Sequence, residues 1–359
     1  MAKILVGLSG GVDSSVTAAL LLEQGHEVVA GYMKNWINQE GIPGDCPWEE
    51  DLQDAAAVAE KLGIELRVVD LIDAYKERIV DYLVDGYAMG YTPNPDVFCN
   101  REMKFGIFLD YALAQGFEGV ATGHYARVFR DEQGGAHLLR GLDSNKDQSY
   151  FLSMMTQEQL QKAYFPIGEY QKSQVRELAE KFDLPTAKKK DSQGICFIGQ
   201  IKMKDFLKHY LPDKPGNIVT RDGKIMGKHE GLHFYTIGQR KGHGVASPVE
   251  GKAYVVVAKD IKKNQLIVGW DEPNSEQLYS CTWRVAHLSW QDPNTQDEML
   301  LIQPRYRSPA IASQITYIAD DQVEIQFSTA QRAIAAGQIC AFYRGDELIG
   351  GGVFEHCVD

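Results

Sequence analysis

The sequence has no long apolar run and few cysteines. No apolar stretch approaches the ~20 residues that a membrane-spanning helix needs, and the longest, such as residues 16–22, fit buried core elements. A strand-like run begins at residue 3, so we expect no signal or transit peptide. Six cysteines, with no C-x-x-C pair and no zinc-type spacing, exclude a disulfide scaffold and a structural metal. We therefore expect a cytoplasmic chain without membrane attachment and without a protein-bound metal.

Positive charge is scarce and unevenly distributed. The 359 residues carry 37 Lys and Arg against 49 Asp and Glu, a net charge of −12, which taken alone argues against a nucleic-acid partner. Residues 1–90 hold 6 basic and 16 acidic side chains, and residues 271–359 hold 5 and 13, with no lysine. Residues 201–270, with 13 basic and 6 acidic side chains, carry +7. Such a block is typical either of a polyanion-binding module or of a solvated, lysine-rich surface.

The order of the patterns indicates an α/β domain followed by β-rich domains. Strand-like runs at residues 4–8, 26–33, 66–72 and 119–125 alternate with helical patterns at residues 12–22, 49–62, 74–89, 103–114 and 171–182. This alternation predicts a doubly wound, mainly parallel sheet. After about residue 210, short strand-like runs predict two small β-rich domains, the last a β-barrel. We expect the domains to cover residues 1–205, 206–272 and 273–359.

The sharpest local signal is a glycine- and serine-rich loop between the first strand and the first helix, Ser9-Gly10-Gly11-Val12-Asp13-Ser14-Ser15. Two glycines allow a tight turn that brings backbone N–H groups to phosphate oxygens, and the helix N-terminus favours an anion. The loop contains no lysine, so it is not the G-x-x-x-x-G-K-[ST] loop. Asp13 would repel phosphate unless it caps the helix or helps to hold Mg²⁺.

Two cysteines occupy unusual settings. Cys99 follows Pro93-Asn94-Pro95-Asp96, and Cys196 follows the cationic run Lys188-Lys189-Lys190. Nearby ammonium groups favour the reactive thiolate form. The residues alone leave a catalytic pair and two ordinary buried thiols equally open, whereas we expect the remaining four, Cys46, Cys281, Cys340 and Cys357, to be small buried apolar residues.

Taken together, these motifs resemble a known family. S-G-G-x-D-S after the first strand resembles the PP-loop of the ATP pyrophosphatases, which cleave ATP between the α- and β-phosphates. The combined pattern is similar to the tRNA-specific 2-thiouridylases over essentially the full length. It consists of the PP-loop, M-K-N-W at residues 33–36, T-P-N-P-D-x-x-C-N at 92–100, A-T-G-H-Y at 121–125, G-L-D-x-N-K-D-Q-S-Y-F-L at 141–152, G-I-C-F-I-G around Cys196 and G-Q-R-K-G at 238–242.

The resemblance implies three groups of site residues. ATP, with Mg²⁺, would be bound by Gly7, Leu8, Ser9, Gly10, Gly11, Val12, Asp13, Ser14, Met33 and Gly123. The target uridine, flipped out of its stack, would meet Asn94, Pro95 and Asp96. The tRNA would be contacted by His124, Lys146, Asp147, Gln148, Arg305, Tyr306, Arg307 and Gln338. Guanidinium groups beside an aromatic ring suit phosphate and a splayed base, although solvated arginines at a strand edge give the same pattern.

The resemblance also implies a chemistry. The uridine O2 would be adenylated by ATP, a persulfide on Cys196 would attack C2, and Cys99 would then release the sulfur and form a Cys99–Cys196 disulfide. Asp96 is either a general acid/base or a turn former. The implied partners are the anticodon arm of tRNA and a persulfide sulfur-donor protein, and we expect a monomer. A PP-loop amidoligase or a tRNA-binding protein without activity are the rival hypotheses; neither uses both cysteine motifs.

Overall fold

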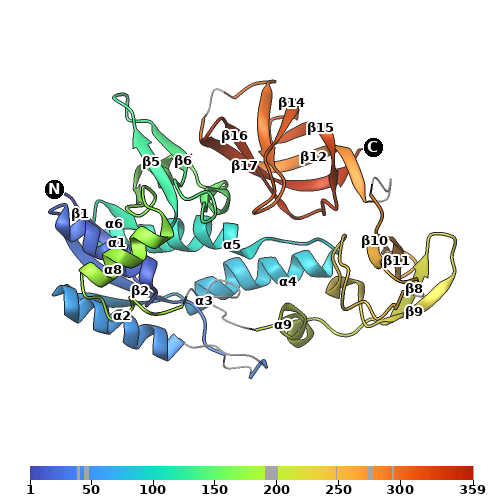
Figure 1. Cartoon of the computed structure of the whole chain (residues 1–359), viewed down its shortest axis with the longest axis horizontal. Coiled ribbons are helices and arrows are strands. Elements are labelled where there is room, and N and C mark those ends of the chain that lie inside the picture. The colour runs from blue at the N-terminus through green and yellow to red at the C-terminus, as the bar shows by residue number, and fades with distance from the viewer. Residues whose placement is uncertain are drawn as a thin grey trace.

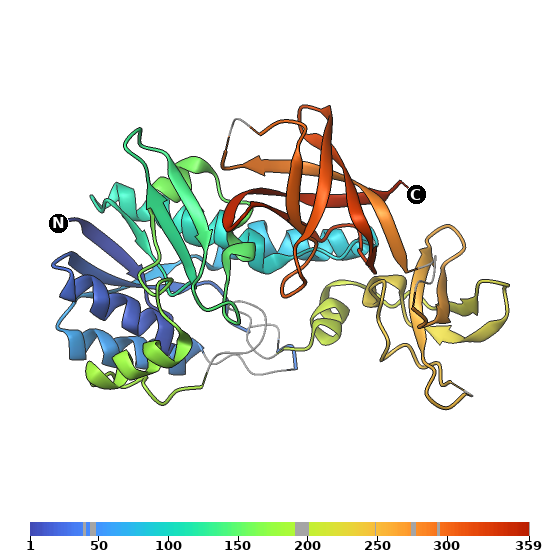
Figure 2. The ribbon, with the colours of Figure 1, turned by 45° about the horizontal axis from the view of Figure 1, so that its top comes forward.

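The computed structural model describes residues 1–38, 41–43, 48–190, 201–247, 249–273, 278–292 and 295–358. It has three parts (Figure 1): a parallel sheet with helices, a small β domain and a β-barrel. The helical stretch that includes α4 (Asp81–Ala88) leads from the parallel sheet toward the small domain, and the barrel lies above it (Figures 1 and 2). No helix among the described residues is long and apolar enough to cross a membrane.

The N-terminal part is the expected doubly wound parallel sheet. Its five strands, in the order β3-β2-β1-β4-β7, are β1 (Lys3–Gly7), β2 (Glu27–Lys34), β3 (Leu66–Asp70), β4 (Gly119–Ala121) and β7 (Ala163–Tyr164), and each neighbouring pair is parallel. Apolar runs such as Ile4-Leu5-Val6 are fully buried because helices cover both faces of a parallel sheet. The prediction of the fold class is confirmed.

The helices of this part follow the predicted periodicity, with several short additions. They are α1 (Val12–Glu23), α2 (Trp48–Leu62), α3 (Ile72–Tyr75), η1 (Lys76–Val80), α4, α5 (Pro95–Phe98), η2 (Cys99–Ile107), α6 (Phe108–Ala114), η3 (Ser149–Leu152), α7 (Gln157–Gln161) and α8 (Lys172–Lys181). The continuous run from α5 through η2 to α6 packs on the sheet through Phe108. A Cβ built on Gly31 of β2 would lie 2.6 Å from the Phe108 ring, so this close packing requires glycine there.

The small β domain begins after helix α9 (Met203–Tyr210), which the sequence patterns did not predict. Its sheet has the order β10-β11-β8-β9, with β8 (Gly216–Thr220), β9 (Ile225–His229), β10 (Tyr254–Asp260) and β11 (Gln265–Trp270), and the short η4 (Leu232–Phe234) follows β9. Val256, Leu266 and Val268 form its buried centre. Strand-like runs at residues 224–227, 254–258 and 266–269 predict β9, β10 and β11, whereas no such run predicts β8.

The C-terminal part is a closed six-stranded barrel, as predicted. Its strands are β12 (Tyr279–Trp290), β13 (Met299–Gln303), β14 (Ile311–Ala319), β15 (Gln322–Arg332), β16 (Ile339–Arg344) and β17 (Glu347–Cys357), and pairing of β12 with β17 closes it. A hairpin of the N-terminal part, β5 (Ala126–Arg130) and β6 (Ala136–Arg140), extends the same sheet, because β6 pairs with β17. The barrel is thus joined to the N-terminal part by backbone hydrogen bonds. The expected domain boundaries stay predictions.

Candidate active site

The carboxyl edge of the parallel sheet gathers the predicted nucleotide-binding residues. The strand order reverses between β1 and β4, and the loops that follow these two strands meet there. Such a switch point is where doubly wound folds bind ligands. A Cβ built on Gly123, after β4, would lie 2.8 Å from the backbone N of Ser14. The two loops are therefore in backbone contact, and only glycine fits at residue 123.

The loop after β1 has the geometry of an anion-binding turn. Gly10 has φ +73°, in the left-handed region, and a Cβ there would collide with the backbone of Asp51 in α2. Gly11 is the N-cap of α1 and has no side chain to occupy the N–H groups of the first turn. The Ser14 hydroxyl accepts from the backbone N of Ser9 at 3.2 Å, which closes the loop. These backbone groups fit a phosphate at the N-terminus of a twelve-residue helix.

Asp13, the one anion of this loop, has two partners from other elements. Nζ of Lys172, the first residue of α8, lies 2.8 and 2.9 Å from its two carboxylate oxygens. The Tyr125 hydroxyl donates to Oδ1 at 2.8 Å. The carboxylate does not cap α1, so of its two expected roles the capping role is wrong. Lys172 neutralises it instead.

The other predicted nucleotide residues divide into backbone and side-chain contributors. Leu8, Val12 and Met33 are buried in the core, so the first two can meet a ligand through the backbone only. The Met33 Cε would lie 3.3 Å from a Cβ built on Gly7, which places the ends of β1 and β2 against each other. Ser9 is exposed, and its hydroxyl lies 3.2 Å from that of Ser14. The adenosine and phosphate roles of individual residues stay predictions.

Cys99 lies at the same edge of the sheet. Asn94 caps α5 by accepting from the backbone N of Val97 at 3.2 Å, and Pro95 starts the helix, where a missing N–H costs nothing. The run from α5 to α6 leads into β4 and is therefore antiparallel to it, so that its N-terminal end, with Cys99, faces the carboxyl edge. The Cys99 side chain is fully buried in the core cluster.

Polar groups next to Cys99 are tied to η3, which packs against the barrel. The Asn100 amide donates to the carbonyl of Phe151 at 3.0 Å, and Nζ of Lys104 donates to its Oδ1 at 2.9 Å. The centroid of the Phe151 ring lies 4.4 Å from that of the Tyr306 ring, which belongs to the turn after β13. The candidate cysteine thus lies one residue from a polar and aromatic bridge between the N-terminal part and the barrel.

Cys196 lies outside the described residues, which omit 191–200. The structure therefore does not test a Cys99–Cys196 pair. Of the cationic run before it, Lys189 pairs with Asp51 and Asp54 of α2, at 2.8 and 2.5 Å, so part of the expected positive charge is neutralised.

The four cysteines expected to be ordinary buried residues differ in exposure. Cys340 is buried, and burial raises the pKa of its thiol. Cys281 is half-buried and Cys357 is exposed near the end of β17, so the expectation is wrong for Cys357. Cys46 lies outside the described residues. No group of three or more His, Cys, Asp and Glu side chains within the described part of the chain is placed to hold a metal ion.

The predicted RNA contacts near the sheet are largely engaged inside the protein. His124 is buried between Phe105 and Phe165, and burial, with Lys104 nearby, holds its pKa well below the usual value. Asp147 accepts from Nη1 of Arg140 at 3.0 Å and from the Ser149 hydroxyl at 3.1 Å. Lys146 and Gln148, on either side of Asp147, are half-buried. Gln148 accepts from the backbone N of Tyr125, in the loop after β4, which also contains His124. Their contacts with RNA stay predictions.

The predicted RNA contacts of the barrel are more accessible. Arg307 is exposed, with φ +63°, and its guanidinium lies 5.3 Å from the Tyr306 ring centroid. Arg305 is half-buried and donates to the carbonyl of Arg332; burial lowers its pKa. The half-buried Gln338 accepts from the backbone N of Ala335 at 3.2 Å. The ring and the Arg307 side chain together offer a surface on which a base can stack.

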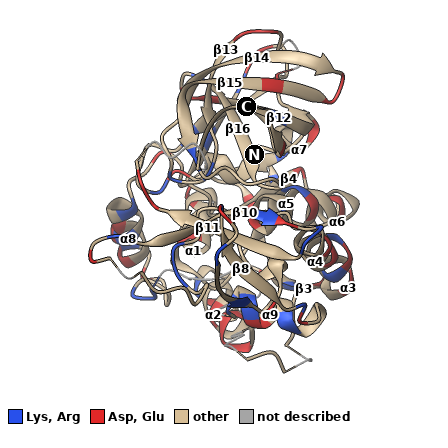
Figure 3. Ribbon diagram, turned by 90° about the vertical axis from the view of Figure 1, so that its right-hand side faces the viewer, with Lys and Arg blue, Asp and Glu red and all other residues tan. Residues whose placement is uncertain are grey.

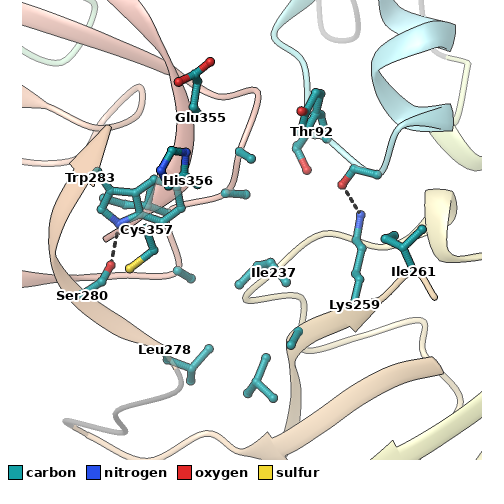
Figure 4. A pocket seen from close by; sticks show the side chains of 18 of the residues that line it. Thr92, Ile237, Lys259, Ile261, Leu278, Ser280, Trp283, Glu355, His356 and Cys357 are labelled. Carbon is teal, nitrogen blue, oxygen red and sulfur yellow. Dashed lines mark hydrogen bonds between the residues drawn. The ribbon is translucent and has the colours of Figure 1, made fainter. Parts of the chain in front are cut away.

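A separate cavity of about 910 Å³ lies where the three parts meet (Figure 4). Lys259 of β10 reaches into it and donates to the carbonyl of Gly90 at 3.0 Å. None of the site residues predicted from the sequence is among the described residues that line this cavity. Its walls include Thr92, Ile237, Lys259, Leu278, Trp283 and Cys357.

Lys172 and Tyr125 are site residues that the sequence patterns did not identify. Lys172 lies in a helix that was predicted, and Tyr125 in a motif that was noticed, but neither pattern connects them to Asp13. The only signal was indirect: a phosphate-type loop with an aspartate and no lysine needs a cation from elsewhere in the chain.

Models of three domain families match the chain in order. They describe a tRNA methyl transferase HUP domain over residues 2–200, a tRNA methyl transferase PRC-barrel domain over residues 204–270 and an aminomethyltransferase beta-barrel domain over residues 280–354. The three matches coincide with the parallel sheet, the small β domain and the closed barrel.

Curated relatives match over nearly the whole chain. The tRNA-specific 2-thiouridylase MnmA of Akkermansia muciniphila is 62% identical over 358 residues, which cover 99% of each chain. Proteins of the same name from Streptococcus agalactiae serotype III and Streptococcus thermophilus are each 48% identical, and the matches cover 98% of this chain and 95% of theirs.

Proposed function

Since the chain belongs to the family of the tRNA-specific 2-thiouridylases, we propose that it catalyses the ATP-dependent 2-thiolation of the wobble uridine of tRNA. The products are 2-thiouridine, AMP and pyrophosphate. The observation that carries the proposal is the identity of 62% over 99% of the chain. The anion-binding loop and Cys99 at one edge of one sheet support it.

The first step activates the uridine. Its O2 attacks the α-phosphorus of ATP, pyrophosphate leaves, and C2 then carries AMP as a leaving group. The phosphates would bind at the glycines of residues 10 and 11 and at the N–H groups of the first turn of α1. Lys172 offsets the negative charge of Asp13 in the same turn. Mg²⁺ would accompany ATP, but both oxygens of Asp13, the one carboxylate of the loop, are engaged by Lys172. Base flipping is required, because C2 is inaccessible in a stacked base.

The second step transfers sulfur. The terminal sulfur of a Cys196 persulfide attacks C2 and displaces AMP, which leaves the base joined to Cys196 through a disulfide. The Cys99 thiolate then attacks the Cys196 sulfur, and the electron pair of the broken S–S bond remains on the sulfur of the 2-thiouridine. The result is a Cys99–Cys196 disulfide, which an external thiol must reduce before the next turnover. Such a reset suits the reducing cytosol.

Residues of the α5 segment would hold the target base. Asn94 is engaged as the cap of α5 through its Oδ1, and its side chain also hydrogen-bonds the Tyr150 hydroxyl, so a contact with the uridine, beside Pro95, would replace that bond. Asp96 stands in the first turn of α5, three residues before Cys99. As a general acid/base it would manage the proton of the uridine, and as a turn former it would only shape the segment. The anticodon arm would lie against Arg307, Tyr306 and their neighbours on the barrel.

A methyl transfer is the second candidate, because the matching models are described as tRNA methyl transferase domains. Thiolation is favoured because it needs ATP to adenylate the uridine, and a PP-loop in which Asp13 is paired with Lys172 suits that step. Methyl transfer does not require a PP-loop. The two candidates predict different products from the same uridine. Mass spectrometry of the nucleosides therefore separates them directly.

The test is reconstitution with the full-length protein, ATP, a persulfide donor and unmodified tRNA. We expect 2-thiouridine and one pyrophosphate per modified base. Cys99→Ser should bind tRNA and load sulfur but lose turnover by on the order of 100-fold or more, and Cys340→Ser, which changes another buried thiol, should turn over normally. Methylated uridine, or normal multiple turnover by Cys99→Ser, would contradict the proposal.

A further inference from the structure

The PP-loop contains an anion where a polyphosphate would bind. Asp13 is the second residue of α1, within the first turn, whose N–H groups favour an anion. A carboxylate is favourable at a helix N-terminus on its own, but it repels a triphosphate at the same place. The loop itself contains no lysine to offset this charge. The neutralising group must come from another element.

Lys172 and Tyr125 form a clamp on this carboxylate, called here the Asp13 clamp. Lys172 contacts both oxygens, at 2.8 and 2.9 Å, and the Tyr125 hydroxyl contacts Oδ1 at 2.8 Å. The Lys172 side chain is 15% exposed and that of Asp13 30%. Because both are shielded from solvent, this pair is screened less than a surface ion pair.

The position of Lys172 is unfavourable for α8 itself. It is the first residue of that helix, where the macrodipole disfavours a cation. Its backbone N is nevertheless fixed there by Oδ2 of the buried Asp143, at 2.9 Å. An ammonium group at the N-terminus of α8 does not stabilise that helix. The favourable interaction of Lys172 is instead the one between its Nζ and the carboxylate of Asp13.

Tyr125 is fixed in the same way. Its backbone N donates to Oε1 of Gln148 at 3.0 Å, and the backbone N of Gln148 donates to its carbonyl at 2.9 Å. Both partners of Asp13 are therefore anchored by one segment, residues 143–148. The clamp is set by the protein before any ligand arrives.

We propose that Lys172 and Tyr125 are positioning residues of the nucleotide site, which hold Asp13 and cancel its charge so that a triphosphate can approach the N-terminus of α1. This rests on the proposed use of ATP. Lys172 acts through Asp13, so the two side chains form one unit. Removing the lysine alone exposes the carboxylate to the phosphates, whereas removing both charges restores a neutral loop.

The test measures binding of a non-hydrolysable ATP analogue to the full chain without tRNA, by calorimetry. We expect Lys172→Met to weaken binding by on the order of tenfold or more, and Lys172→Met combined with Asp13→Asn to recover most of the loss. Lys172→Arg should bind nearly as the unchanged protein does, and Tyr125→Phe should lose a few-fold. The control is Lys181→Met, at the other end of α8, which breaks the exposed pair with Glu23.

Unchanged binding by Lys172→Met overturns the inference. A double variant as weak as the single one also overturns it, because the lysine would then act on the phosphates directly. If the unchanged protein bound no ATP analogue, the proposed use of ATP would fail, and the clamp with it. Weak binding by Lys172→Met with an unaltered unfolding midpoint, together with rescue by the second substitution, supports it, since a merely structural role gives no such rescue.

Discussion

Lys259 is a half-buried cation that the proposed chemistry does not use. It stands in the cavity between the three parts of the molecule and donates to the carbonyl of Gly90. Burial lowers the pKa of its ammonium group from 10.5 to about 8. At neutral pH the folded protein therefore keeps a charged, poorly solvated ammonium group. This lowers the free energy of unfolding, so it destabilises the folded state.

Lys259→Met should stabilise the protein at pH 7 and not at high pH. Between about pH 8 and the ordinary value of 10.5, the unfolded chain binds more protons than the folded one, so the stability of the unchanged protein rises with pH in that window. We expect the variant to gain on the order of 1 kcal/mol at pH 7, after loss of the hydrogen bond. The gain should vanish near pH 10.5. Denaturant unfolding at both pH values measures it.

A lysine on the surface of the same domain provides the control. Lys263, which pairs with Asp260, is exposed. Lys263→Met therefore removes the same charge from a solvated position instead of from a cavity. Its effect should be small at both pH values. A gain by Lys259→Met that does not change with pH would show that the substitution acts through packing instead.

The Asp13 clamp shows which part of a site local sequence predicts. The loop itself followed from glycines between a strand and a helix, because its conformation depends on neighbouring residues only. The partners of Asp13 lie 112 and 159 residues further along the chain. Tertiary packing brings them together, and neither residue stands in a pattern that indicates a carboxylate partner. The resemblance assigned roles to loop residues, but it did not assign the clamp.

At the scale of elements, the sequence patterns predicted the α/β alternation and, with runs at residues 283–288, 299–303, 312–318, 323–327, 341–343 and 348–354, all six barrel strands. They missed the β5–β6 hairpin. Its strands are short, and Phe129 is 57% exposed, so neither strand shows the clear alternation of a half-buried sheet. Its place is fixed by pairing with β17, more than 200 residues away. A strand whose partner lies in another domain gives little signal of its own.

His137 connects this hairpin to the barrel, and its charge makes the connection depend on pH. Nδ1 lies 2.6 Å from Glu347 of β17, and Nε2 lies 3.1 Å from Asp131 in the hairpin turn. The Glu347 hydrogen bond, followed by that of Asp131, raises the pKa of His137. The stabilisation is complete below the unfolded pKa, near 6.5, and is lost as pH rises through the higher folded pKa.

His137→Gln should therefore destabilise the protein at pH 6 and have little effect at pH 9. We expect a difference below about 1 kcal/mol at pH 6, because the imidazole is partly exposed and solvent screens the pair. Thermal unfolding at the two pH values measures it, with His209→Gln, which alters an exposed histidine of α9, as the control. An equal loss at both pH values would mean that the hydrogen bonds matter and the charge does not.

At the scale of the whole molecule, ion pairs offset part of the +7 charge of the basic block of residues 201–270. Lys204 and Lys208 both pair with Glu230, and Arg240 pairs with Asp271. Figure 3 accordingly shows red and blue side by side at α9. Several of the lysines thus belong to a mixed surface. Salt-sensitive binding of tRNA by this block stays a prediction, and its slope against salt concentration measures the number of phosphates contacted.

The three parts of the molecule meet at the segment that leads to the residues proposed to bind the uridine. The backbone N of Thr92 donates to the carbonyl of Ala336 in the barrel at 2.8 Å, and its hydroxyl lies 3.3 Å from that of Thr236 in the small domain. Gly337 of the barrel packs directly against residues 91 and 92. A Cβ built on it would lie 2.8 Å from Cβ of Tyr91 and 2.9 Å from the backbone N of Thr92. Thr92 is two residues before Asn94, so a shift here moves α5.

Gly337→Ala should consequently reduce both stability and thiolation. Gly337 has φ +89° and Gly345 has φ +65°, but nothing lies within 4 Å of a Cβ at Gly345. Both substitutions carry the backbone cost of about 1–2 kcal/mol, and only Gly337→Ala adds a collision of about 1–3 kcal/mol. We expect Gly345→Ala to lose stability but keep its rate of thiolation, whereas Gly337→Ala loses more stability and several-fold in rate under conditions where both are folded. Equal rates for the two variants would show that the junction of the three parts does not position α5.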